Sequence, residues 1–147
     1  MSEATTWVDP YRAYNFKIMI GGEAVAHFTE CTGIDIDVAT VEYREGGQAA
    51  VIRQVPTITT YHDITLRYGL TASRAMWDWF LATAQGRVER RNVSIVLLDS
   101  AGSTPVIQWN LIAAFPKRWR GPELRASARE VAIEEIVLAY ESLGRAS

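Results

Sequence analysis

The chain has 147 residues, which is the length of one ordinary domain and enough to bury a single hydrophobic core. Hydrophobic residues make up 48% and charged residues 22%, a composition that excludes a disordered or fibrous chain. A net charge of −2 gives no overall positive field for nucleic acid or an anionic membrane, so we expect one globular domain over residues 1–147.

Alternating apolar and polar residues predict strands in the first half of the chain. Residues 14–20 alternate and are followed by Gly21-Gly22, a hairpin turn signal, so residues 24–29 are expected to return as the partner strand. Residues 34–43 predict a long strand with one face in water, and residues 63–68 alternate in the same way.

Residues 44–58 predict a long connection without a regular period. This segment carries apolar residues that need cover, either from the core of the same chain or from another subunit: Val51, Ile52, Val55 and Ile58.

One amphipathic helix is predicted over about residues 71–85. Thr71 or Ser73 can cap its start, and Gly86 stands where a left-handed residue is preferred after a helix. Three aromatic residues are expected to anchor the helix, a role that ordinary core packing explains equally well: Trp77, Trp79 and Phe80.

Residues 93–98 and 106–115, joined by a turn over 99–103, predict a second hairpin, and Pro116 is expected to end it. Residues 130–143 fit both a helical and a strand pattern. The local pattern favours a helix slightly, and the choice stays open on these grounds.

The residues show no motif for nucleophilic catalysis, phosphate binding or a metal site. His27 and His62 lack a partner at a recognisable spacing, and Asp63 points to the opposite strand face from His62. The single cysteine, Cys31, is expected to be a small, partly buried residue. We therefore expect no enzymatic activity, no metal and no cofactor.

Two charged features have a similarly plain interpretation. Four acidic residues on or beside one extended segment predict a solvated acidic stripe: Asp35, Asp37, Glu42 and Glu45. Residues 116–122 combine cations with Trp119, but one small basic patch releases few counterions, so no specific nucleic-acid binding is expected.

The first fourteen residues lack the basic and apolar parts of a secretory leader, and no apolar run is long enough for stable membrane anchoring.

Charge is divided along the chain. Residues 30–45 carry a net charge of −4, and residues 117–129 carry +4. Opposed patches suit a head-to-tail contact between copies, whereas neutralisation within one chain is an alternative of equal weight.

A set of short segments runs through nearly the whole chain in this order: Asp9–Tyr11, Gly33-Ile34, Glu42–Gly47, Asp63–Gly69, Trp77–Phe80, Ile95–Asp99, Trp109-Asn110, Pro116–Pro122 and Glu130–Glu134. Their order and spacing resemble the tail tube proteins of contractile phages and of phage-tail-like contractile injection systems, especially those with extracellular particles.

The resemblance implies a mainly β fold, related to the type VI secretion tube protein. Two packed antiparallel sheets would form a small β-barrel or sandwich with one flanking α-helix, and residues 130–143 would be strand. It also implies that six subunits close a ring and that rings stack into a hollow tube, which is driven through a target envelope. The implied partners are the sheath, baseplate and tube-terminator proteins, with a tape measure or effector cargo in the lumen. Such a subunit is made in the bacterial cytoplasm and incorporated into a phage tail or tail-like particle.

The resemblance further implies that the connection after residue 42 lies at contacts between subunits and rings, and the basic segment is expected to supply the cationic side of such a contact. The expected contact residues are Glu42, Tyr43, Arg44, Glu45, Gly46, Gly47, Val51, Ile52, Arg53, Val55, Ile58, Lys117, Arg118 and Arg120.

Two other classes of protein are weighed against this one. A monomeric β-barrel module that binds a small apolar ligand would keep residues 51–58 within its own fold. A hydrolase would require a nucleophile and a base, which the motifs do not provide.

Overall fold

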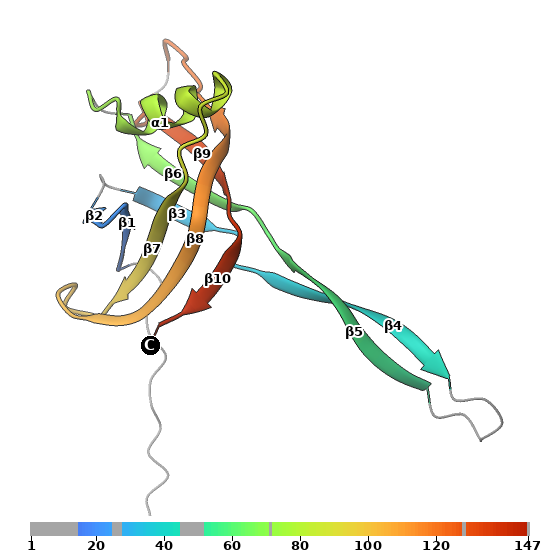
Figure 1. Cartoon of the computed structure of the whole chain (residues 1–147). Coiled ribbons are helices and arrows are strands. Elements are labelled where there is room, and N and C mark those ends of the chain that lie inside the picture. The colour runs from blue at the N-terminus through green and yellow to red at the C-terminus, as the bar shows by residue number, and fades with distance from the viewer. Residues whose placement is uncertain (1–14, 25–27, 45–51, 71, 128, 147) are drawn as a thin grey trace, which may run out of the picture.

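Antiparallel strands make up most of the chain in the computed structural model, which describes residues 15–24, 28–44, 52–70, 72–127 and 129–146 (Figure 1). The elements are β1 (Phe16–Ile20), β2 (Glu23–Ala24), β3 (Phe28–Thr32), β4 (Ile36–Arg44), β5 (Ile52–Tyr61), β6 (Ile64–Gly69), α1 (Ala75–Ala84), β7 (Arg91–Leu98), β8 (Pro105–Arg120), β9 (Ile133–Ala139) and β10 (Ser142–Arg145). The predicted mainly β class with one flanking helix is confirmed.

The strands form two antiparallel sheets. Among the described residues, one sheet has eight strands in the order β2-β1-β7-β8-β9-β6-β3, with β10 also paired to β8, and the other consists of β4 and β5. Across the described residues the large sheet ends at β2 and β3 and does not close on itself, so this copy is an open, folded sheet and not a closed barrel. We refer to the eight-stranded sheet with α1 as the body.

β8 joins the two halves of the body. Its first part pairs with β7, and residues from Phe115 onward pair with β9. Ala113 has a positive φ of 54° just before this change of partner. A register shift between Pro116 and Arg118 accommodates the proline, which has no N–H for the ladder. The expectation that Pro116 ends the strand was therefore wrong.

The core fills the inside of the folded sheet with the apolar side chains that alternate inward from its strands. Among the most completely buried are Ile18, Ile64, Leu66, Val93, Leu111, Ile136 and Leu138. α1 packs against β8 at one end of the sheet and adds Met76 and Trp79 to this core (Figure 1). No helix in the described ranges has the length and apolar character to cross a membrane.

α1 begins later than the sequence pattern predicted, at Ala75. The Ser73 hydroxyl accepts a hydrogen bond from the Ala75 N–H at 3.4 Å, while Thr71 lies outside the described residues. Gly86 has a φ of +84°, so the predicted left-handed residue after the helix is confirmed.

Two strand predictions are corrected by long-range pairing. Only Glu23–Ala24 returns along β1, whereas Phe28–Thr32 pairs with β6, where the Phe28 and Tyr68 rings meet at 5.7 Å. Residues 25–27 lie outside the described part of the chain. The segment 130–143 contains β9 and the start of β10, because β6 and β8 offer strand partners to it. The local preference for a helix there was wrong, and the implication of the resemblance is confirmed.

Candidate assembly interface

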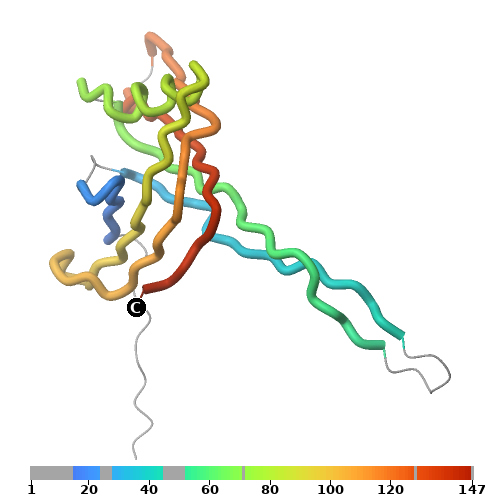
Figure 2. Tube along the Cα trace, viewed as in Figure 1, coloured from blue at the N-terminus to red at the C-terminus, as the bar shows by residue number. Residues whose placement is uncertain are grey.

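β4 and β5 leave the body together as a long two-stranded arm (Figures 1 and 2). Their pairing runs from Ile36 opposite Tyr61 to Arg44 opposite Ile52. The irregular connection predicted over residues 44–58 was therefore largely wrong, because Ile52 to Ile58 belong to β5. A bulge in β5 opposite Ala39, next to Pro56, interrupts the alternation that would have revealed the strand.

The arm presents apolar side chains to solvent. Seven of them are between 43% and 69% exposed: Ile36, Val38, Val41, Tyr43, Ile52, Val55 and Ile58. The pairing register puts Ile36 and Val38 on one face near the body, and Val41, Tyr43 and Val55 on the opposite face farther out. An isolated hairpin is at best marginally stable in water, so an arm with uncovered apolar residues on both faces calls for a partner surface.

Most of the predicted contact residues with a described position lie on this arm. Glu42, Tyr43 and Arg44 end β4, and Arg53 is paired with Tyr43 across the arm. All of them are exposed. Glu45, Gly46, Gly47 and Val51 lie outside the described residues.

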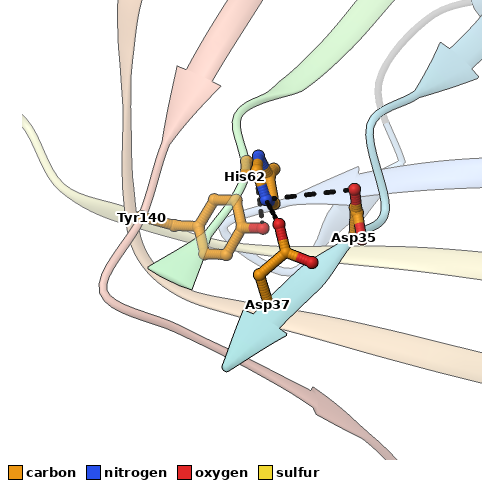
Figure 3. Close-up of polar contacts among 4 residues, drawn as sticks. All are labelled: Asp35, Asp37, His62 and Tyr140. Carbon is orange, nitrogen blue, oxygen red and sulfur yellow. Dashed lines mark hydrogen bonds and ion pairs between the residues drawn. The ribbon is translucent and has the colours of Figure 1, made fainter. Parts of the chain in front are cut away.

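Hydrogen bonds and a ring contact hold the two arm strands together at their base and connect them to the body (Figure 3). The backbone N–H of His62 donates to the carbonyl of Asp35 at 3.1 Å. The Tyr140 hydroxyl donates to the carbonyl of His62 at 2.5 Å, and the Tyr61 and Tyr140 rings are 6.0 Å apart. His62 therefore lies where the arm and the body meet.

The His62 side chain faces two carboxylates. Its Nε2 lies 2.5 Å from Asp37 Oδ2 and 3.9 Å from Asp35 Oδ2. A hydrogen bond donated by the His62 ring to the Asp37 carboxylate raises the pKa of His62 above its usual 6.5; desolvation opposes this, and the charges of Asp35, Asp37 and Asp63 add to the rise. The three side chains form a hydrogen-bonded cluster in which the imidazole nitrogen and the carboxylate oxygens all lie within 4.8 Å of one another.

Sequence reasoning missed this cluster. Asp35 and Asp37 were expected in a solvated stripe, and His62 was expected to lack a partner. The alternation of the two aspartates along one strand face was a usable signal. The position of His62 opposite them depends on the β4–β5 register, which the chain pattern does not reveal.

The predicted cationic residues lie near the end of β8. Lys117 Nζ is 2.6 Å from Asp63 Oδ2, and Arg118 and Arg120 are exposed. Glu30, from the acidic segment, lies 3.3 Å from Arg67. Asp63 lies outside the acidic segment 30–45, and Arg67 lies outside the basic segment 117–129. Neither of these two ion pairs therefore joins the acidic segment directly to the basic one.

The aromatic residues of α1 differ in their surroundings. Trp79 is 1% exposed, and its indole N–H donates to the carbonyl of Glu89 at 2.7 Å. Trp77 is partly buried, with its ring 4.7 Å from that of Trp119 and 6.4 Å from that of Phe80.

An open β body carrying an exposed apolar arm is typical of a chain that associates with other copies or partners, because it leaves strand edges and apolar surface uncovered. Residues 12–144 match the family model of the T4-like virus tail tube protein gp19, so the chain belongs to this tail tube family. No curated protein sequence matches the chain at a significant level.

Solved structures of contractile particles are similar to the chain over nearly its full length. A chain of the anti-feeding prophage cap, the AFP tube terminating cap, is 29% identical, with a TM-score of 0.88 and coverage of 99% of this chain and 96% of that one. A chain of the PVC sheath–tube complex of an extracellular contractile injection system is 28% identical, with a TM-score of 0.84 and coverage of 94% and 92%. A type six secretion system protein shares the fold at 11% identity, with a TM-score of 0.59 and coverage of 90% and 83%. The predicted family resemblance is confirmed.

Proposed function

We propose that this protein is a non-enzymatic structural subunit of the inner tube of a contractile injection system, in the shaft or in its terminating ring. Six copies close a ring, and rings stack into a hollow tube that is driven through a target envelope and can carry cargo. The sheath, the baseplate and a tube terminator are its further partners. The whole chain, residues 1–147, acts as one tube domain.

The exposed arm is the observation that carries this proposal. Val41, Val55 and Ile58 are 53%, 43% and 69% exposed, although side chains of this kind are normally buried. Apolar residues occur on both faces of the arm, so one neighbouring surface would cover only half of them. A stacked ring assembly offers neighbours both around the ring and along the axis, and so supplies cover for both faces.

The open edges of the body provide a second argument. β2 and β3 are the end strands of the large sheet across the described residues. Unpaired strand edges attract further strands, and closure into a ring removes them. Identical copies that join edge to edge would convert this open sheet into part of a continuous closed wall.

The competing function, a monomeric ligand carrier, requires a different position for residues 51–58. A monomeric carrier would bury residues 51–58 around an internal ligand. Ile52, Val55 and Ile58 are instead exposed on the arm, away from the core of the body.

Electron microscopy and sedimentation of the purified full-length chain test the proposal. We expect rings or tubes in negative stain and a sedimentation coefficient that grows with concentration. Deletion of residues 47–54 should abolish the tubes while the circular dichroism of the body remains. A variant with Gly and Ser at these eight positions keeps the chain length and should also fail to assemble.

Two outcomes would contradict the proposal at different levels. A wild-type chain that stays a single copy at every concentration and salt condition overturns the tube function. Unchanged tubes from the deletion variant overturn only the role assigned to the arm.

A further inference from the structure

We propose that His62 is a proton-dependent anchor that holds the two strands of the arm together where they leave the body. In its protonated form the imidazolium bridges Asp35 and Asp37, and the arm moves more freely once the ring loses its proton. The anchor concerns one copy of the chain and does not depend on tube formation.

The position of His62 supports this role. It follows the last residue of β5, and Asp35 precedes the first residue of β4, so the side-chain contacts span the two strands at the place where they leave the body. The backbone carbonyl of His62 accepts a hydrogen bond from the hydroxyl of Tyr140, which directly follows β9. One residue thus contacts both arm strands and the body (Figure 3).

The charges around His62 make the stability of the arm base depend on whether the imidazole is protonated. Asp35 and Asp37 both face the imidazole, and Asp63 is the next residue in the chain, where it is paired with Lys117 of β8. Arg145 of β10 lies on a groove of about 330 Å³ that Asp35 also lines. Loss of the His62 proton removes the positive charge that lies between Asp35 and Asp37 and leaves these carboxylates to repel one another.

The direction of the pH effect follows from the raised pKa of His62. A group with a higher pKa in the folded state stabilises that state fully below its unfolded value, here about 6.5. The stabilisation is lost as the pH rises through the folded pKa. The arm should therefore be held in mildly acidic solution and released in alkaline solution.

A held arm would also favour assembly, a consequence that rests on the proposed function. Ordering a flexible segment costs free energy when it docks, and an arm whose two strands are already held together at the base avoids part of that cost. Tubes should then form at lower protein concentration below the folded pKa of His62 than above it.

The test combines proton titration of the His62 ring by NMR with hydrogen exchange of the arm. The full-length chain is used in EDTA from about pH 5.5 to about pH 8.5, and wild type and variants are compared in the same sedimenting species. His27→Gln assigns the ring signals. Exchange of arm amides, corrected for the intrinsic pH effect, should rise about two- to tenfold over this range in the wild type.

Three variants separate the anchor from a general pH effect. His62→Gln keeps a polar side chain but cannot titrate, so its arm should exchange fast at every pH. Asp37→Asn should bring the pKa of His62 back toward 6.5 and weaken the response. Asp78→Asn, on the exposed face of α1, should behave as wild type.

The outcomes distinguish the anchor from the proposed function. Flat exchange across the pH range, or an equal response in His62→Gln, overturns the anchor even if tubes form. A pH-dependent arm on a chain that never forms tubes supports the anchor and contradicts the tube proposal. Arm protection that appears only with added Zn²⁺ would show metal binding in place of proton binding, and would also overturn the anchor.

Discussion

The indole N–H of Trp79 donates a hydrogen bond of 2.7 Å to the backbone carbonyl of Glu89, and so links the middle of α1 to the segment that leads into β7. The same indole is 1% exposed and lies 5.1 Å from the Arg91 guanidinium. This residue is therefore both a packing element of the core and the hydrogen-bond donor to the Glu89 carbonyl.

Substitution of Trp79 should separate these two contributions. Trp79→Phe keeps an aromatic ring but loses the donor, and should lower the free energy of unfolding by about 1–3 kcal/mol. Trp79→Ala also leaves a cavity and should cost about 3–5 kcal/mol. Urea unfolding measures both values. Trp77→Phe, at a partly buried position, serves as the control and should cost clearly less; a larger loss at Trp77 than at Trp79 would contradict this assignment.

Gly33 sits between β3 and β4, next to the base of the arm, and tolerates no side chain. It has a φ of +96°, and a Cβ there would lie 2.2 Å from the carbonyl oxygen of Asp63. Gly33→Ala should therefore lower the free energy of unfolding by about 2 kcal/mol or more. The matched control is Gly144→Ala in β10, where a Cβ meets nothing within 4 Å. Thermal unfolding should show a large decrease for the first variant and a small change for the second. Equal effects would show that the close approach to Asp63 does not determine stability.

Charged substitutions on the arm should affect association without affecting the fold. Val41 and Val55 lie directly opposite each other and are 53% and 43% exposed. Val41→Asp or Val55→Asp should change the free energy of unfolding of the body by less than about 0.5 kcal/mol. Tube yield in negative stain should fall strongly, because a carboxylate would have to be buried at the contact.

Val88→Asp is the matched control for the arm variants. Val88 is 48% exposed and lies between α1 and β7, outside the arm. Its substitution should leave tube yield near that of the wild type. Equal loss of tubes from all three variants would indicate a general solubility effect in place of an arm contact.

The cationic end of β8 predicts a salt-dependent association. Arg118→Glu with Arg120→Glu reverses two exposed charges, while the ion pair of Lys117 with Asp63 remains. We expect a higher protein concentration for tube formation in the double variant, with unchanged unfolding. Added salt should weaken wild-type assembly through the same contact. Arg74→Glu, which disrupts only an exposed pair with Asp78 at 3.6 Å, is the control. Normal assembly of the double variant would exclude these arginines from the contact.

Cys31 should react slowly in the folded protein. Burial raises the pKa of its thiol from 9.0 to about 11, so the thiolate fraction at pH 8 falls by about a hundredfold. Alkylation by iodoacetamide, followed by mass spectrometry, should be correspondingly slow and should speed up as the pH rises toward 11. The urea-unfolded chain provides the reference rate, and equal rates in both states would contradict the burial of this thiol.

Local sequence signals correctly predicted those turns and helices that depend on residues close together in the chain. Gly21-Gly22 predicted a hairpin turn and Gly86 a left-handed residue after the helix, and all three have positive φ. The apolar spacing around Trp79 predicted the helix. The turn at 99–103 was also readable: Asp99 accepts hydrogen bonds from the N–H groups of Ser103 and Thr104. Each of these features depends on residues within a few positions of one another.

The errors occur where a distant partner decides the structure. Pro116 looked like a strand end, but a register shift opposite β9 lets β8 continue past it. Residues 130–143 fit a helix locally, yet β6 and β8 complete the hydrogen bonds of β9 on both sides. A long-range ladder outweighs a weak local preference because it satisfies the backbone of a buried strand.

The sequence by itself determined a mainly β chain with one helix, and the order of its short segments was enough to indicate the tail tube family. Only the tertiary structure decided that the segment around Val55 is a strand on a projecting arm, and that His62 lies beside Asp37 at the base of that arm. The physical reason is the same in both cases. Periodicity records which side of a strand is apolar, whereas register and partner choice depend on contacts between residues far apart in the chain.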